Sequence, residues 1–351
     1  MTDIACETVA LDIAILRVEI LYTGGTFGMV DGGDGLRPRT GIGGDVADLI
    51  DAYTDRSGIP VEFRYRELEH VIDSAHADPA TVDVIAEQVR AALRVTRSEG
   101  GTPPDGVILI HGTDTMAYTG ARLAFELHDL AVPVVLTGAQ IPLGQPGSDA
   151  GENLLLALDS IATQPASGTF IAFGSRLHPA VRASKRSSHG RDGFVTVRPH
   201  TPPPTAIASP VAAVEAETAS PVGLFTVFPG MDTDLLDAAL RIYHGGVVLE
   251  CYGAGTMPAS VAAVDAIRKA TGRGTPVVVI THCDSGSVDL SLYQPGRALL
   301  GAGAIGGGDM TREAALAKLG HLASLGLTTA ELRRWMTTNL LGELTESPAG
   351  H

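Results

Sequence analysis

The chain has 351 residues, of which 44% are hydrophobic and only 19% are charged, and this length and composition are typical of a globular protein with two domains. Its formal net charge of -15 repels phosphate groups, so nonspecific binding to nucleic acid or to an anionic membrane surface has no electrostatic basis. The cysteines Cys6, Cys251 and Cys283 are odd in number and far apart, unlike a disulfide framework or a zinc site. We therefore expect a protein of a reducing compartment without a nucleic-acid partner.

The N-terminal segment has no features of a targeting signal. Its first twenty residues contain Asp3, Glu7, Asp12 and Glu19 instead of a basic region. No uninterrupted apolar run in the chain approaches the roughly 18 residues that a membrane span needs. The sequence thus predicts a cytoplasmic protein that is neither secreted nor inserted into a membrane.

Short apolar runs alternate with longer segments of helical period, which predicts βαβ units, a largely parallel sheet and therefore an α/β protein. Most of the runs are followed by Gly, Thr, Ser or Asp. In open α/β sheets ligands bind at the carboxyl ends of the strands, so we expect the chemistry at these polar strand ends. The predicted strands are, in chain order, Ile13–Tyr22, Val107–Ile110, Val134–Leu136, Thr169–Phe173, Gly223–Phe228, Val247–Cys251 and Val277–Thr281.

The stretch from His200 to Pro221 contains consecutive prolines and little periodicity, so we interpret it as the connection between two domains. The expected division is an N-terminal catalytic domain at 1–200, a linker at 201–221 and a C-terminal domain at 222–351. Two helices are predicted near the end of the chain, one over Thr311–Ser324 and one that starts at a capping box on Thr328. Trp335 is expected to be a core anchor.

The first candidate for chemistry is the sequence LYTGGTFG, Leu21 to Gly28, where the first strand ends. Its glycines permit a tight turn that exposes Thr26 at the carboxyl edge of the strand, as a nucleophile elbow exposes its serine. A glycine-rich turn that only packs, or that cradles a phosphate, is the alternative. The spacing does not match the dinucleotide-binding fingerprint of a Rossmann domain.

The second candidate is VILIHGTDTMAYT, Val107 to Thr119, in which four polar side chains follow a buried strand and open a helix. Asp114 or Thr115 could simply cap that helix. Four hydrogen-bonding side chains are more than one cap requires, however. Asp114 is therefore a candidate for holding an ammonium group, and Thr113 for positioning a water molecule.

The third candidate is Lys185 in the sequence RASKRSS, which follows a predicted strand. Most lysines in basic loops are solvated, so Lys185 gains its interest only in combination with the other candidates. A threonine hydroxyl is a poor nucleophile and needs a neighbouring group to activate it. A lysine paired with Asp114 and relaying through Thr113 would do this for Thr26.

Together these motifs resemble the bacterial-type L-asparaginases. The sequences TGGT, HGTDTM and RASK carry the resemblance, and TGAQIPL, SDAGENLL and GGGDMTREAALAKL extend it toward the cytoplasmic, type I branch. TVFPG and the closing NLLGELT belong to the same pattern. The motifs occur in family order from about Ile20 to Thr345, nearly the whole chain, and are jointly specific.

The resemblance implies an α/β fold with a larger N-terminal parallel-sheet domain and a smaller C-terminal α/β domain, assembled as a homodimer or homotetramer. It implies that Thr26 attacks the side-chain amide of L-asparagine, and that Thr113, Asp114 and Lys185 form a proton relay. Asp73 and Ser74 match the element that holds the α-carboxylate and α-amino groups of the substrate. The reaction needs no metal and no organic cofactor.

The sequence departs from the family pattern at three places. Leu36 stands where many members carry a tyrosine that assists the nucleophile, and we expect this leucine to cover the pocket and exclude water. Ala75 and His76 follow Ser74 where a second serine or glutamine and an aspartate are usual. Thr256 occupies the place of an asparagine that often completes the site of the neighbouring subunit. These departures affect rate, affinity and the choice between asparagine and glutamine more than the reaction class.

Other functions stay open at this point. The asparaginase-like subunit of a transfer-RNA-dependent amidotransferase shares the TGGT and HGTDTM motifs, but it carries an extra N-terminal domain. A non-catalytic amino-acid sensor would explain Leu36 and Ala75, although it would not need Thr26, Thr113, Asp114 and Lys185 together. Cys283 could line an effector pocket, but we expect it to be a small buried residue of the core.

Overall fold

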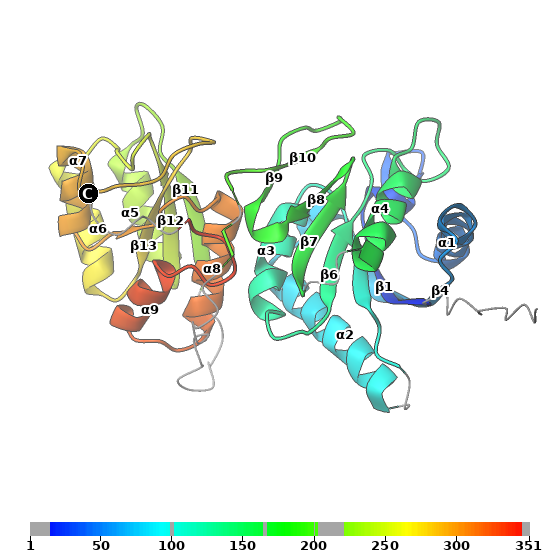
Figure 1. The fold of residues 1–351 in the computed structure, drawn as a ribbon. Coiled ribbons are helices and arrows are strands. Elements are labelled where there is room, and N and C mark those ends of the chain that lie inside the picture. The colour runs from blue at the N-terminus through cyan, green and yellow to red at the C-terminus, as the bar shows by residue number, and fades with distance from the viewer. Residues whose placement is uncertain (1–14, 99–101, 164–166, 200, 203–220, 346–351) are drawn as a thin grey trace, which may run out of the picture.

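The computed structural model describes residues 15–98, 102–163, 167–199, 201–202 and 221–345. The described residues form two α/β domains that lie side by side (Figure 1). Each domain has a central sheet covered by helices on both faces, which is the arrangement that buried parallel strands require. Most of the predicted linker, residues 203–220, lies outside the described residues, so its role as a linker stays a prediction.

The N-terminal domain is built on a six-stranded sheet of order β4-β1-β5-β6-β7-β8, in which only the last pairing is antiparallel. Helices α1 and α4 pack on one face of this sheet, and α2 and α3 pack on the other. The strands are β1 Leu16–Gly24, β4 Val61–Ile72, β5 Gly106–Ile110, β6 Pro133–Thr137, β7 Gly168–Phe173 and β8 Arg176–Pro179. The helices are α1 Gly43–Ser57, α2 Pro79–Ser98, α3 Met116–Glu126 and α4 Ala150–Thr163.

The C-terminal domain has a smaller, fully parallel sheet of order β11-β12-β13-β14. Helices α5, α6 and α7 cover one face, and α8 and α9 cover the other. The strands are β11 Val222–Thr226, β12 Gly246–Cys251, β13 Val277–Thr281 and β14 Ile305–Gly306. The helices are α5 Thr233–Ile242, α6 Val261–Gly272, α7 Gln294–Gly301, α8 Arg312–Ser324 and α9 Thr329–Met336.

The two domains meet where α3 of the first lies along α8 of the second (Figure 1). Phe125 of α3, Val181 and Ala317 of α8 form a small buried apolar cluster there. Beside it, His321 of α8 lies 3.2 Å from the carboxylate of Glu126 of α3. The C-terminal domain thus packs through α8 directly on α3, the helix that follows β5.

The predicted fold class is confirmed, with the larger parallel-sheet domain first and the smaller α/β domain second. Each predicted strand corresponds to an observed one, although the start predicted for the first, Ile13–Tyr22, falls partly on residues outside the described ranges. The twelve-residue edge strand β4 was not predicted. Trp335 is only partly buried, but it packs against the core of the C-terminal domain as expected.

The predicted capping box on Thr328 is confirmed, because its hydroxyl accepts from the backbone N–H of Glu331 and the Glu331 carboxylate accepts from the backbone N–H of Thr328. We expect Thr328→Ala to lower the free energy of unfolding by about 1 kcal/mol, the usual cost of losing such a cap. Urea unfolding followed by circular dichroism measures this change. A fall in kcat per folded molecule would contradict the purely structural role of this cap.

Candidate active site

Three strand ends of the N-terminal sheet pack against one another through glycine. Gly25 has φ 85°, and a Cβ at this position would lie only 2.2 Å from the Cα of Gly112 in the turn after β5. A Cβ on Gly112 would in turn lie 2.4 Å from the hydroxyl oxygen of Ser74, which follows β4. Only glycine, which has no Cβ, allows two backbone segments to approach this closely. The turns that carry Thr26, Ser74 and Thr113 are therefore neighbours at the carboxyl edge of the sheet.

Gly25→Ala tests this close packing. Because both the positive φ and the approach of Gly112 exclude a Cβ, we expect the variant to displace the Thr26 turn and to lower kcat/KM by at least about tenfold, as a misplacement of about 1 Å can. The matched control is Gly58→Ala, at φ 73° in open space at the end of α1, which has the backbone strain without the clash. Steady-state kinetics with equal losses in both variants would contradict the role of the Gly25–Gly112 contact.

Thr26 begins a short 3-10 helix, η1 (Thr26–Gly28), directly after β1. Its side chain is partly buried. Thr23, at the end of the same strand, donates a hydrogen bond from its hydroxyl to the carbonyl of Ile110 at 3.1 Å, which ties β1 to the last residue of β5. The turn therefore holds Thr26 at the strand end that the sequence indicated.

Lys185 joins two of the other candidates. Its ammonium group donates to the hydroxyl of Thr113 at 2.8 Å and to a carboxylate oxygen of Asp114 at 2.7 Å. The side chain of Lys185 is 18% exposed, whereas that of Asp114 is 64% exposed. Asp114 is thus engaged by Lys185 instead of capping α3, whose N-cap is Thr115. Its exposed carboxylate can also receive an ammonium group from solvent.

A cleft of about 420 Å³ opens beside this set, lined among others by Asp114, Lys185, Ser187 and Glu313. Gln140, from the loop after β6, joins Thr113 to the loop between β9 and β10. Its amide oxygen is 3.5 Å from the Thr113 hydroxyl, and its amide nitrogen donates to the carbonyls of Ser187 and Gly190. Gln140 was not identified as a site residue from the sequence. The quoted motif TGAQIPL contains it, but the motif alone does not indicate which side chain faces the site.

Asp73 and Ser74 lie at the end of β4, in and before a short 3-10 helix, η2 (Ser74–His76). The Asp73 carboxylate accepts from the backbone N–H of Ala75 at 3.1 Å. Ser74 is buried, and its carbonyl accepts from the hydroxyl of Thr115 at 2.8 Å, which fixes η2 to the start of α3. Both residues thus lie next to the Gly25–Gly112 contact.

His111, which precedes this contact, is fully buried, and its Nδ1 lies 2.7 Å from the carbonyl oxygen of Gly112. Burial lowers the pKa of His111 to about 4. The ring is therefore neutral at neutral pH and stabilises the turn as a hydrogen-bond donor. It does not act there as a charged group.

Two expectations from the sequence are wrong. Leu36 was expected to cover the pocket, but it lies in β3 (Leu36–Pro38) on a hairpin with β2 (Met29–Asp31), and its side chain is 48% exposed. The strand β3 packs against η1, the short helix of Thr26, but the Leu36 side chain is half exposed to solvent and does not seal a buried site. Cys283 was expected to be buried, yet it is partly exposed beside a small cleft after β13.

Thr256 lies in the turn after β12 in the C-terminal domain, where its hydroxyl lies 3.4 Å from the carbonyl of Tyr252. Its expected role in the site of a neighbouring subunit stays a prediction. Among the described residues there is no group of three His, Cys, Asp or Glu side chains that could hold a metal ion. The described helices are all too short or too polar to cross a membrane.

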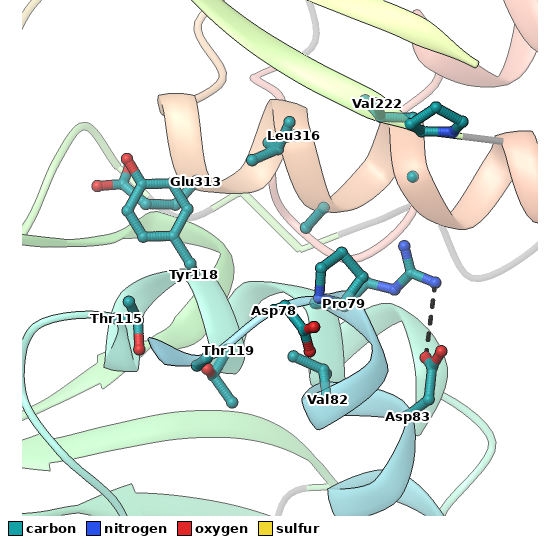
Figure 2. Close-up of a pocket in the computed structure, with 15 residues that line it drawn as sticks. Asp78, Pro79, Val82, Asp83, Thr115, Tyr118, Thr119, Val222, Glu313 and Leu316 are labelled. Atoms are coloured by element: carbon teal, nitrogen blue, oxygen red, sulfur yellow. Dashed lines mark ion pairs between the residues drawn. The ribbon is translucent and has the colours of Figure 1, made fainter. Parts of the chain in front are cut away.

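A second cavity, of about 280 Å³, borders the site at the contact between the domains (Figure 2). Its walls are mostly apolar and include Val82, Val222 and Leu316. Thr115, Tyr118 and Glu313 also line it. Asp114 and Lys185 line the polar cleft and not this cavity, whereas Thr26 and Thr113 line neither. The polar cleft beside Lys185 is therefore the better candidate for a polar substrate.

The described residues thus form a two-domain α/β fold in which a threonine, an aspartate and a lysine are joined by hydrogen bonds beside the turn of Thr26. Residues 17–217 match the family model "Asparaginase, N-terminal", and residues 221–336 match "Glutaminase/Asparaginase C-terminal domain". The chain therefore belongs to the asparaginase family.

Several known proteins are similar to this chain. L-asparaginase 1 of Escherichia coli strain K12 is 35% identical over 340 residues, which cover 93% of this chain and 98% of that protein. The crystal structure of L-asparaginase I from Vibrio cholerae superposes with a TM-score of 0.77 at 30% identity, covering 95% of this chain and 100% of that one. One subunit of the glutamyl-tRNA(Gln) amidotransferase of Aeropyrum pernix is 31% identical over 347 residues, 87% of this chain and 78% of that protein. The first two relatives confirm the resemblance to the type I branch.

Proposed function

We propose that the protein hydrolyses L-asparagine to L-aspartate and ammonia and that Thr26 is its nucleophile. The observation that carries the proposal is the pair of hydrogen bonds from Lys185 to Thr113 and Asp114, next to the turn that presents Thr26. The family and the asparaginases similar to this chain support the substrate.

In the proposed reaction the hydroxyl oxygen of Thr26 attacks the side-chain amide carbon of asparagine. Its proton passes through Thr113 to Lys185, whose side-chain amine must be neutral at that moment. Lys185 then returns the proton to the leaving nitrogen. The C–N bond breaks, ammonia leaves, and water then attacks the acyl group to release aspartate and restore the Thr26 hydroxyl. In this proposal Asp114, Asp73 and Ser74 hold the α-amino and α-carboxylate groups of the substrate.

The test is the release of ammonia and aspartate from L-asparagine by the purified protein, with L-glutamine in parallel. We expect equal amounts of ammonia and aspartate from asparagine. Tight binding of asparagine without ammonia release would instead favour the amino-acid sensor. The glutamine reaction decides the selectivity that Ala75 and His76 leave open.

We further propose that the protein works in the cytoplasm. The two described cysteines, Cys251 and Cys283, are free thiols, which is the form that a reducing compartment maintains.

We also propose that the protein is a homodimer or homotetramer. In sedimentation velocity at micromolar concentration we expect at least a dimer. We expect specific activity to fall when dilution dissociates the subunits. A fully active monomer would contradict this assembly and with it the role of Thr256 across the interface.

A further inference from the structure

The strand that carries Lys185 lies between the two domains. β9 (Ala183–Lys185) pairs with β10 (Phe194–Thr196) in a two-stranded sheet separate from the central one. Side chains alternate along a strand, so Ala183 and Lys185 share one face and Ser184 takes the other. Ala183 packs in the core of the N-terminal domain, and Lys185 reaches the residues that precede α3. This face of β9 therefore belongs to the N-terminal domain.

The opposite face of β9 contacts the C-terminal domain. The hydroxyl of Ser184 donates to a carboxylate oxygen of Glu313 at 2.8 Å, and both residues are buried, at 6% and 4% exposure. Glu313 lies in the first turn of α8, where the helix dipole stabilises a negative charge. Figure 2 shows its carboxyl group beside the ring of Tyr118 from α3. Burial raises the pKa of Glu313 above its ordinary value and that of Tyr118 to about 12.

Arg182 makes a second tie just before the same strand. Its guanidinium is fully buried, pairs with the Asp309 carboxylate at 3.2 Å and donates to the carbonyl of Gly342 at 2.8 Å. These contacts hold residue 182 to the C-terminal domain, and the Ser184–Glu313 hydrogen bond holds the residue next to Lys185. The position of the lysine thus depends on both domains of the same chain.

We propose that Glu313, acting through Ser184, is a positioning residue that keeps the Lys185 ammonium within hydrogen-bond reach of both Thr113 and Asp114. This inference rests on the proposed function, because Lys185 matters to the reaction only there. The two contacts of Lys185, at 2.8 and 2.7 Å, leave little room for movement of its strand. A displacement of about 1 Å at a catalytic group can lower the rate by about 10²-fold.

The sharpest comparison is Ser184→Val against Ser184→Thr. Valine and threonine have nearly the same shape, but only threonine keeps a hydroxyl that can donate a hydrogen bond to Glu313. We expect kcat to fall by about tenfold to 10²-fold in Ser184→Val, with KM within about threefold, and to stay within about threefold of the wild type in Ser184→Thr. Equal kcat values for the two variants would overturn the inference, whatever their stability.

A second pair approaches the same bond from the other side. Glu313→Gln keeps a carbonyl oxygen that accepts from Ser184, whereas Glu313→Ala does not. We expect the glutamine variant to retain kcat and the alanine variant to lose it to the same extent as Ser184→Val. Thr328→Ala is the control for stability alone, because it lowers the unfolding midpoint without touching β9. If Ser184→Val does not fold, the two Glu313 variants test the positioning role of Glu313 in its place.

A crystal structure of each Ser184 variant separates failure of this inference from failure of the proposed function. We expect the Lys185 ammonium to leave hydrogen-bond distance of Thr113 or Asp114 in Ser184→Val and to keep both contacts in Ser184→Thr. An unmoved lysine in both variants would overturn the positioning role. A wild type that releases no ammonia from asparagine would overturn the proposed function, while the two crystal structures still decide what holds Lys185.

Discussion

Thr26→Ala is expected to lower kcat for ammonia release from asparagine by about 10⁴-fold or more while leaving the fold intact. Removal of the nucleophile from an enzyme that works by covalent catalysis has effects of this size. The side chain lies in the short helix after β1, and the packing of that turn comes from Gly25, Gly112 and Thr23 instead. Loss of the Thr26 hydroxyl therefore removes the reacting group and keeps the contacts that shape the site.

Thr26→Ser is the matched control for this variant. It keeps a hydroxyl at the same position and loses only a methyl group, so we expect it to retain measurable turnover. Isothermal titration with asparagine should show that the alanine variant still binds the substrate. Substantial ammonia release by Thr26→Ala would show that another residue is the nucleophile.

Lys185→Met should lower kcat by about 10²–10⁴-fold, the usual cost of losing a general acid or base. Methionine keeps most of the length of the side chain but cannot donate to Thr113 or Asp114. Because the Asp114 side chain is 64% exposed, water replaces the lost ion pair there, and the pair itself contributes at most about 1 kcal/mol to folding. The loss should therefore appear in kcat and only weakly in stability.

Arg191→Met is the control for Lys185→Met. Arg191 follows β9 toward β10 and forms an exposed ion pair with Glu152. Since such surface pairs contribute little, we expect kcat and stability to stay near the wild type. A loss of less than about tenfold in Lys185→Met, equivalent to about 1.4 kcal/mol of barrier, would make Lys185 a bystander.

Much of the fold follows from local patterns in the sequence. The apolar runs at Val107–Ile110 and Val277–Thr281 are buried central strands, and such continuous runs are typical of parallel strands that are covered on both faces. The capping box at Thr328 is equally local. β4 was overlooked although Val61, Phe63 and Tyr65 alternate with charged residues, since an edge strand with one polar face lacks a continuous apolar run.

The candidate site was only partly predictable for a physical reason. Thr26 and Thr113 stand in motifs at the ends of β1 and β5, and the parallel topology brings these two strand ends to one edge. Lys185 lies in β9, in a separate antiparallel sheet, so parallel topology does not explain its position. The contact of Ser184 with Glu313 joins residues 129 positions apart across two domains, and no local pattern encodes it. Leu36 shows the converse error, because its place in the motif did not reveal that its side chain is half exposed to solvent.

The most direct test of Thr26 as the nucleophile is covalent labelling with an asparagine analogue that carries an electrophilic diazoketone in place of the side-chain amide. After incubation with the purified protein, peptide mapping by mass spectrometry locates the modified residue. We expect one label, on Thr26, that excess asparagine prevents. A label on Thr113 or on Lys185 that asparagine also prevents would contradict the assignment of Thr26 as the nucleophile.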